Sequence, residues 1–140
     1  MRELDSSLHD KISELCEQGD SAVEEERLDQ ALCLFEEALK LIPEPIDDWE
    51  ASTWVLTALG DTCFLKGDFE QARTHLLAAT HCPDAIGNPM IHLRLGQVQL
   101  ELGNTARAHD ELARAYMSEG KEIFEGEDPK YLEFVLARLR

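Results

Sequence analysis

Long hydrophobic runs are absent from this sequence of 140 residues. No apolar stretch approaches the roughly 20 residues that a helix needs to cross a bilayer, so we expect no transmembrane segment. The first ten residues, MRELDSSLHD, lack the positive charge and the apolar core of a secretory signal. We therefore predict a cytoplasmic protein.

Basic residues are scarce as well. The chain has 13 lysines and arginines against 29 aspartates and glutamates, which gives a formal net charge of −16. A surface of this charge repels phosphate backbones and anionic lipids, so the composition argues against nucleic-acid and membrane partners. It favours a protein or peptide partner that is neutral to basic.

Signatures of catalysis and metal binding are also missing. The four cysteines form no C-x-x-C pair, and we interpret them as small core residues rather than disulfide positions. His75 and His81 are six residues apart and therefore lie on different faces of a helix, unlike paired zinc ligands. No glycine-rich phosphate loop is present. We predict no catalytic residues, no metal and no cofactor, and hence a protein that is not an enzyme.

Helical periodicity is dense, whereas the alternation typical of strands is missing. Between Leu28 and Ile42, apolar residues recur at steps of three and four, which is the stripe of an amphipathic helix. We predict seven helices, near residues 6–25, 28–42, 48–66, 69–81, 89–102, 105–124 and 129–139.

Capping residues mark the expected helix boundaries. Side chains able to cap a helix N-terminus precede four of the predicted helices, at Asp47, Asp68, Asn88 and Asp128. The first two are followed after three residues by Glu50 and Gln71, as in a capping box. Gly67 and Gly103 lie where tight turns between helices are needed.

One arrangement of small and bulky residues recurs three times. Gly19, Gly60 and Gly96 are each followed by alanine after twelve residues, a bulky apolar residue after four more, and alanine after three more. The resulting positions are Ala31, Phe35 and Ala38; Ala72, Leu76 and Ala79; and Ala108, Leu112 and Ala115. Small residues let two helices approach closely, and the bulky residue fills the groove between them. We therefore expect three helix hairpins in tandem.

This pattern resembles the tetratricopeptide repeat, a helix–turn–helix unit of 34 residues. The resemblance implies an all-α fold, namely an α-solenoid of three repeats near 8–43, 48–84 and 89–122 with a capping helix at 129–139, in a single domain of residues 1–140. The spacings between the three glycines, 41 and 36 residues, exceed 34. We attribute the excess to a longer connection after Pro43 and a small insertion at 86–88.

The resemblance also implies where a partner binds. Members of this family line the inner surface of the solenoid with the first helix of each repeat. Those positions here give the predicted partner-binding residues Glu17, Asp20, Trp54, Asp61, Phe64, Leu65, Met90, Leu93, Arg94 and Gln97. An apolar centre inside a charged rim is typical of protein interfaces. Alternatively, Phe64 and Leu65 belong to the core, Trp54 packs on a neighbouring helix, and the acidic residues are a solvated face.

We predict a non-catalytic protein-interaction module that binds a partner protein or peptide in the concave groove of the solenoid. The Lys and Asn residues with which some members grip a peptide's C-terminal carboxylate are absent from the matching positions. The chain is similar to short stand-alone bacterial tetratricopeptide proteins, some of which are immunity proteins. An inhibitor of a basic, nuclease-like toxin is therefore one alternative function, and a secretion or assembly chaperone is another. The oligomeric state stays open.

Overall fold

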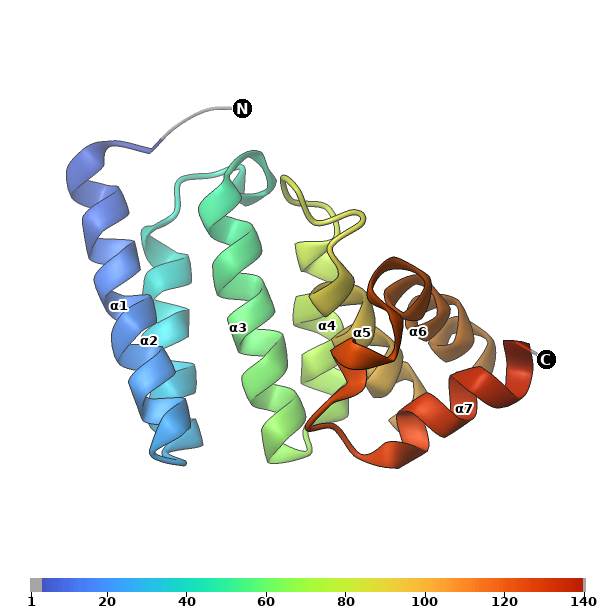
Figure 1. The fold of residues 1–140 in the computed structure, drawn as a ribbon. Helices are drawn as coiled ribbons and strands as arrows, with labels where there is room; N and C mark the ends of the chain where they lie inside the picture. The colour runs from blue at the N-terminus through green and yellow to red at the C-terminus, as the bar shows by residue number, and fades with distance from the viewer. Residues whose placement is uncertain (1–3, 140) are drawn as a thin grey trace. The chain divides into compact units, whose positions relative to one another are not determined.

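The computed structural model describes residues 4–139, and it is built of helices joined by short turns (Figure 1). The expected domain limits at residues 1 and 140 lie outside the described residues. In chain order the elements are α1 (Ser6–Glu24), α2 (Leu28–Leu41), the 3-10 turn η1 (Ile46–Asp48), α3 (Glu50–Lys66), α4 (Phe69–Ala79), α5 (Pro89–Glu101), α6 (Thr105–Glu119), the 3-10 turn η2 (Gly120–Phe124) and α7 (Pro129–Leu139). Since no strand occurs among residues 4–139, the predicted all-α class is confirmed. No helix in that range is both long and apolar enough to cross a membrane.

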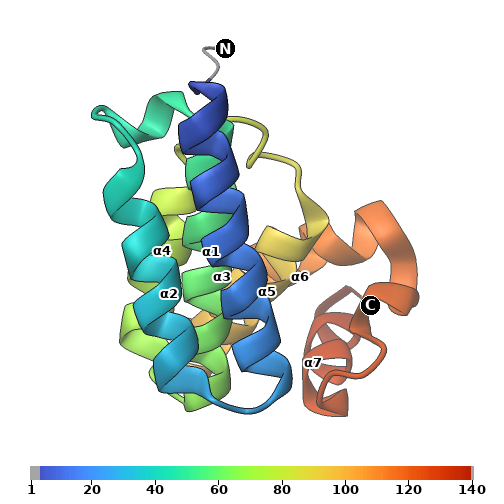
Figure 2. The same cartoon turned by 90° about the vertical axis from the view of Figure 1, so that its left-hand side faces the viewer.

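The chain forms two compact units, one ending at Ile86 and the other beginning at Gly87. The N-terminal unit contains α1–α4, and the C-terminal unit contains α5–α7. Within the N-terminal unit, α1 and α3 form one layer while α2 and α4 form the other (Figures 1 and 2). The single domain expected from the sequence stays a prediction.

The repeated glycines lie where two helices of a hairpin touch. A Cβ atom built on Gly19 of α1 would lie 2.5 Å from Phe35 Cε1 of α2, and one built on Gly96 of α5 would lie 2.6 Å from Leu112 Cγ of α6. The alanines that follow the glycines in the sequence pattern are buried too, at Ala31, Ala38, Ala72, Ala79, Ala108 and Ala115. The close helix approach predicted from the spacing is therefore confirmed.

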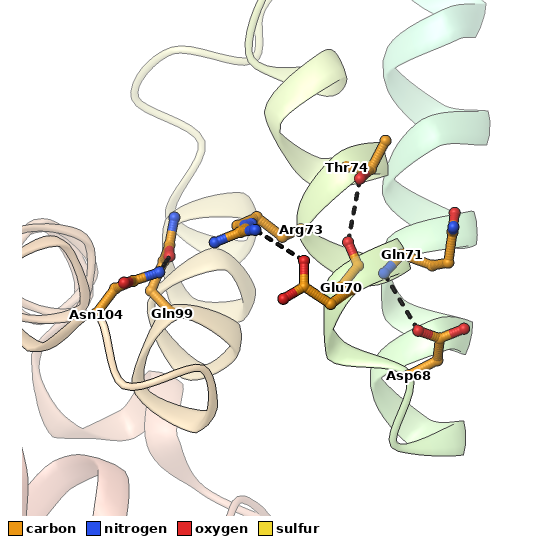
Figure 3. A network of polar contacts seen from close by, with 7 residues as sticks. All are labelled: Asp68, Glu70, Gln71, Arg73, Thr74, Gln99 and Asn104. Atoms are coloured by element: carbon orange, nitrogen blue, oxygen red, sulfur yellow. Dashed lines mark hydrogen bonds and ion pairs between the residues drawn. The ribbon is translucent and has the colours of Figure 1, made fainter.

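The N-terminus of α4 is capped as predicted. Asp68 Oδ1 accepts a hydrogen bond from the backbone N–H of Gln71 at 3.3 Å (Figure 3). One turn further on, Arg73 pairs with Glu70 at 2.8 Å, and the hydroxyl of Thr74 donates to the Glu70 carbonyl at 3.1 Å (Figure 3). These contacts are local to α4, so they define where this helix begins.

Two further caps are confirmed in the C-terminal unit. Asn88 accepts from the backbone N–H of Met90 at 3.0 Å, which starts α5 at Pro89. Asp128 accepts from the backbone N–H of Lys130 at 3.0 Å, which starts α7. Both prolines occupy the first helical turn, where the missing N–H costs nothing.

The predicted cap at Asp47 is wrong. Residues 46–48 form the turn η1, and α3 begins at Glu50 after Trp49, with no capping side chain. Trp49 is buried, and its indole Nε1–H donates to the Pro43 carbonyl at 2.8 Å. The chain therefore enters α3 around a buried aromatic side chain rather than through a carboxylate cap.

The predicted end of the sixth helix is also wrong. We expected it to run to residue 124, but α6 ends at Glu119. Gly120 has a φ of +73°, which an α-helix does not allow, and the turn η2 follows. Backbone conformation at a glycine therefore stops a helix that the apolar periodicity would have continued.

Candidate partner-binding site

One candidate surface lies on the α1 and α3 layer of the N-terminal unit. On α3, Trp54, Asp61 and Leu65 follow one another at spacings of seven and four, so they share a side of the helix. The side chains of Trp54 and Leu65 are 41% and 52% exposed, although large apolar residues normally bury their surface. Together with Glu17 and Asp20 of α1, these three residues are called the α1–α3 face below.

Trp54 is held in place by a ring contact with α1. The rings of His9 and Trp54 have centroids 5.7 Å apart and an interplanar angle of 84°, which is the edge-to-face arrangement that aromatic pairs prefer. Trp54 thus packs on a neighbouring helix, as the alternative interpretation of the sequence had it, yet keeps two-fifths of its side chain accessible. His9 could not be predicted as part of this face, because nothing in the periodicity pairs it with α3.

The acidic residues of α1 lie close enough to repel one another. Glu17, Asp20 and Glu24 recur at steps of three and four on one side of the helix. Burial, followed by the charges of Glu24 and Glu17, raises the pKa of Asp20 above its ordinary value. The ionised form of Asp20 is therefore less stable than that of an isolated aspartate, and a cation bound beside it would relieve the repulsion.

Two other polar groups on this layer are less accessible. Burial first, and then the charge of Asp20, raises the pKa of the Cys16 thiol to about 11. The hydroxyl oxygen of Thr57 is buried and has no hydrogen-bond partner among residues 4–139. Thr57 lies between Trp54 and Asp61 on α3, and its buried hydroxyl is not exposed on the face.

Phe64 belongs more to the core than to this face. Its ring is half-buried and packs against Phe69 of α4, with centroids 5.8 Å apart. Leu65, the next residue, is exposed. Of the two apolar residues predicted at this end of α3, the structure therefore leaves Leu65 accessible.

The predicted α5 residues of the C-terminal unit differ in exposure. Met90 is 51% exposed, whereas Leu93 and Gln97 are buried. Arg94 is half-buried. Only Met90 of these four therefore presents an open side chain.

The C-terminal segment of the chain covers Arg94 and Gln97. The guanidinium of Arg94 donates to Glu127 Oε1 at 3.2 Å and to Gln97 Oε1 at 2.9 Å. The amide of Gln97 donates to the same Glu127 oxygen at 2.8 Å. Glu127 lies between η2 and α7, so one carboxylate from this connection holds two residues that we had predicted to face a partner.

A second set of contacts follows one turn further along α5. Tyr131 Oη donates to Glu101 Oε2 at 2.6 Å, and Lys130 Nζ lies 2.7 Å from the same oxygen. Burial tends to raise the pKa of Glu101, but the hydrogen bonds from Lys130 and Tyr131 outweigh burial and hold the pKa below its ordinary value. Tyr131 is itself buried. Neither Glu127 nor Tyr131 was predicted from the sequence, since both lie about 30 residues from their partners.

Metal-ligating side chains do not gather into a site in the described part of the chain. Groups of three or more His, Cys, Asp or Glu side chains placed to hold a metal ion are absent from residues 4–139. Burial lowers the pKa of His75, which favours its neutral form. His92 is buried as well, with its Nδ1 2.6 Å from Glu111 Oε2 and its Nε2 accepting from the Gly87 N–H at 3.1 Å. Nδ1 thus joins α5 to α6, and Nε2 joins α5 to the connection that precedes it.

Comparison with known proteins gives one family and a common fold. Residues 14–82 match the tetratricopeptide repeat family. No curated protein sequence matches the chain. The family match begins within α1 and ends shortly after α4, so it spans most of the first two helix hairpins.

Solved structures extend the likeness over almost the whole chain. The tetratricopeptide domain of Arabidopsis OM64 is 18% identical with a TM-score of 0.72, covering 95% of this chain and 97% of that one. The first such domain of Spaghetti (RPAP3), bound to an HSP90 peptide, is 16% identical with a TM-score of 0.73, covering 98% and 100%. The Yersinia enterocolitica secretion chaperone SycD, in complex with a peptide of the translocator YopD, is 15% identical with a TM-score of 0.71, covering 91% and 92%. At these identities the comparisons show a shared fold.

Proposed function

Because the chain is a tetratricopeptide repeat protein, we propose that it is a non-catalytic interaction module that binds a protein or peptide on the α1–α3 face. The observation that carries the proposal is Trp54, a large aromatic residue that is 41% exposed on the same side of α3 as Asp61. Aromatic anchors of this kind supply most of the binding energy in many protein interfaces. Two structurally similar proteins were solved with peptides bound, which supports an interaction role for the fold.

The charge of the face favours a basic or neutral partner. Asp61 lies between Trp54 and Leu65 on one side of α3, and Glu17 and Asp20 are exposed on α1 of the same layer. Since ionised Asp20 is already repelled by Glu17 and Glu24, a lysine or arginine from the partner gains from all three charges. The negative charges of nucleic acid and of anionic membranes would be repelled by these carboxylates, so we propose neither as a partner.

A secretion or assembly chaperone is the second candidate. It is favoured by the fold shared with SycD, and with Pseudomonas aeruginosa PcrH, which was solved in complex with the chaperone-binding region of PopB at 18% identity and a TM-score of 0.66. The alternative of an immunity protein against a basic toxin rests on the charge of −16 alone. All three proposals place the protein in a reducing, cytoplasmic setting, which agrees with its four free cysteines.

Crosslinking at Trp54 tests the proposal. A photo-reactive amino acid at position 54 is expected to capture a partner from the native host, whereas the same group at Leu77 of α4 is not. Leu77 is a matched control because it is 38% exposed on the other helix layer. Mass spectrometry identifies the captured protein, which is then purified for binding measurements.

Titration of the purified partner then gives the energetic test. Trp54→Ala is expected to weaken binding by about 2 kcal/mol, and Leu77→Ala to leave it unchanged. A toxin inhibitor steered by charge would lose association rate steeply with added salt, whereas a chaperone gripping an apolar segment would respond little. Unchanged affinity in Trp54→Ala, with helical circular dichroism intact, would remove Trp54 from the site.

A further inference from the structure

The α5 surface of the C-terminal unit already holds a ligand, namely the chain's own C-terminal segment. Arg94, Gln97 and Glu101 lie at spacings of three and four on one side of α5. Arg94 and Gln97 donate to the carboxylate of Glu127, and Glu101 accepts from Tyr131 and Lys130. Along α5, two hydrogen-bond donors, Arg94 and Gln97, are followed by one acceptor, Glu101. Along the segment, the acceptor Glu127 is followed by donors at residues 130 and 131, so the partners meet in the same order.

The Arg94–Glu127 contact is largely shielded from water, whereas Lys130 in the second contact is half exposed. The side chains of Arg94 and Glu127 are 13% and 21% accessible, and that of Glu101 is 20% accessible. Charge-assisted hydrogen bonds that are partly removed from water are stronger than surface ion pairs. They are also specific, because a carboxylate in the wrong place would leave the Arg94 guanidinium without this partner. The surface is thus built to recognise a carboxylate and, one turn later, a hydroxyl or an ammonium group.

The connections of the segment are suited to opening. Gly120 and Gly126 have φ values of +73° and +81°, and no atom lies within 4 Å of where a Cβ would stand on either glycine. A pocket of about 280 Å³ remains between η2 and α7, lined by residues that include Phe124, Pro129 and Leu132. The pocket is formed by the segment's own residues, and the segment has two glycine joints at which the backbone can turn.

We propose that residues 121–139 form a latch that covers a second binding surface on α5 and competes for it with a partner. The displacing ligand is a segment with a carboxylate four residues before a tyrosine, the spacing of Glu127 and Tyr131. Phe124, Tyr131 and Val135 are the buried apolar anchors that keep the latch closed in the absence of this ligand. The inference rests on the proposed function in one respect: the protein or peptide partner of the module would compete with residues 121–139 for the α5 surface.

The latch can be tested with the chain's own sequence. The probe is a fluorescent synthetic peptide of residues 121–139, titrated by anisotropy into the full-length protein. Glu127→Ala in the protein removes the carboxylate that Arg94 and Gln97 hold, so the peptide is expected to bind this variant about tenfold more tightly than wild type. The matched control is Glu125→Ala, an exposed glutamate two residues away that carries the same charge change. It is expected to behave like wild type.

A second measurement separates a latch from a fixed part of the core. In Glu127→Ala, amide hydrogens of residues 121–139 are expected to exchange faster while those of α5 and α6 keep their protection. Tyr131→Phe retains the buried ring and is expected to give a smaller gain in peptide affinity. Equal peptide affinity for Glu127→Ala and wild type, or loss of protection throughout the C-terminal unit at once, would overturn the latch.

Failure of the latch is distinguishable from failure of the proposed function. The peptide assay contains only this chain's sequence, and Trp54→Ala is expected to leave its result unchanged. A latch that fails while Trp54→Ala still weakens the external partner leaves the α1–α3 face as the site.

Discussion

Gly60 of α3 and Leu76 of α4 are packed so closely that no side chain fits between them. A Cβ atom on Gly60 would lie 2.5 Å from Leu76 Cγ and 2.6 Å from Leu76 Cδ2, well inside van der Waals contact. Leu76 is completely buried, so it has little room to withdraw. The absence of a side chain at position 60 therefore sets the distance between the two helices.

Gly60→Ala is expected to lower the free energy of unfolding by about 1–3 kcal/mol, since overpacking costs more than the helix propensity gained from alanine. Urea denaturation followed by circular dichroism measures the change. Leu76→Ala alone is expected to cost about 2–5 kcal/mol through the cavity it leaves. The double variant should be more stable than the sum of the two losses predicts. If the two losses in free energy of unfolding simply add, the side chains at positions 60 and 76 do not clash in Gly60→Ala.

Asp20→Asn is expected to stabilise the folded protein at pH 7, because it removes a charge that is partly buried and repelled by Glu24 and Glu17. The gain is expected to be only a few tenths of a kcal/mol, because solvent screens this exposed residue. Burial, Glu24 and Glu17 raise its pKa, so its contribution to stability is present at acid pH and is lost as pH rises through the folded-state pKa. Urea denaturation at pH 7 and about pH 3 tests the sign, and exposed Asp110→Asn on α6 is the control. A loss of stability at pH 7 would contradict the expectation.

The same substitution separates stability from function. If Asp20 serves a basic partner, Asp20→Asn should weaken that partner's binding while the protein itself becomes more stable. Opposed effects of this kind are typical of residues kept for binding rather than for folding.

The C-terminal unit is expected to lose stability in acid through Glu101. Lys130 and Tyr131 hold the pKa of Glu101 below its ordinary value of 4.5 despite burial and the nearby charge of Asp128. A lowered pKa means that the stabilisation is present above pH 4.5 and is lost as pH falls through the folded-state pKa. Hydrogen exchange of α5 and α7 between about pH 5 and pH 3 measures it, after correction for the intrinsic exchange rates. Glu101→Gln should flatten this pH dependence, and an identical slope in both proteins would refute the assignment.

Cys33 is expected to react with iodoacetamide before the other cysteines. It is exposed on α2, whereas Cys63 and Cys82 are buried. Burial, with smaller contributions from Asp20 and Asp68 respectively, raises the pKa values of Cys16 and Cys63 to about 11, so almost no thiolate forms at pH 8. Peptide mass spectrometry after timed labelling should show Cys33 modified at least about tenfold faster than Cys16. Comparable rates in native protein would indicate that α1 opens readily.

The framework of hairpins could be predicted from the sequence because its causes are local. A glycine, an alanine and a bulky residue at set spacings bring two consecutive helices together, and the turn between them is too short to allow another arrangement. Most helix limits were predictable for the same reason, since Asp68, Asn88 and Asp128 cap helices through bonds to residues two or three positions away. The limits that failed, at Trp49 and Gly120, depend on a buried indole and on a positive φ rather than on apolar periodicity.

The surfaces available for binding were decided by tertiary structure. The resemblance to the tetratricopeptide repeat put both Trp54 and Arg94 among the predicted partner-binding residues, yet it could not tell that Trp54 packs on His9 and stays partly open while Glu127 covers Arg94. These two contacts join residues more than 30 positions apart. Helical periodicity allows many such contacts, and complementary charge and shape in the folded chain decide which of them form. Sequence by itself therefore determined which helices pair, and only the folded chain decided which of their outward faces remain accessible.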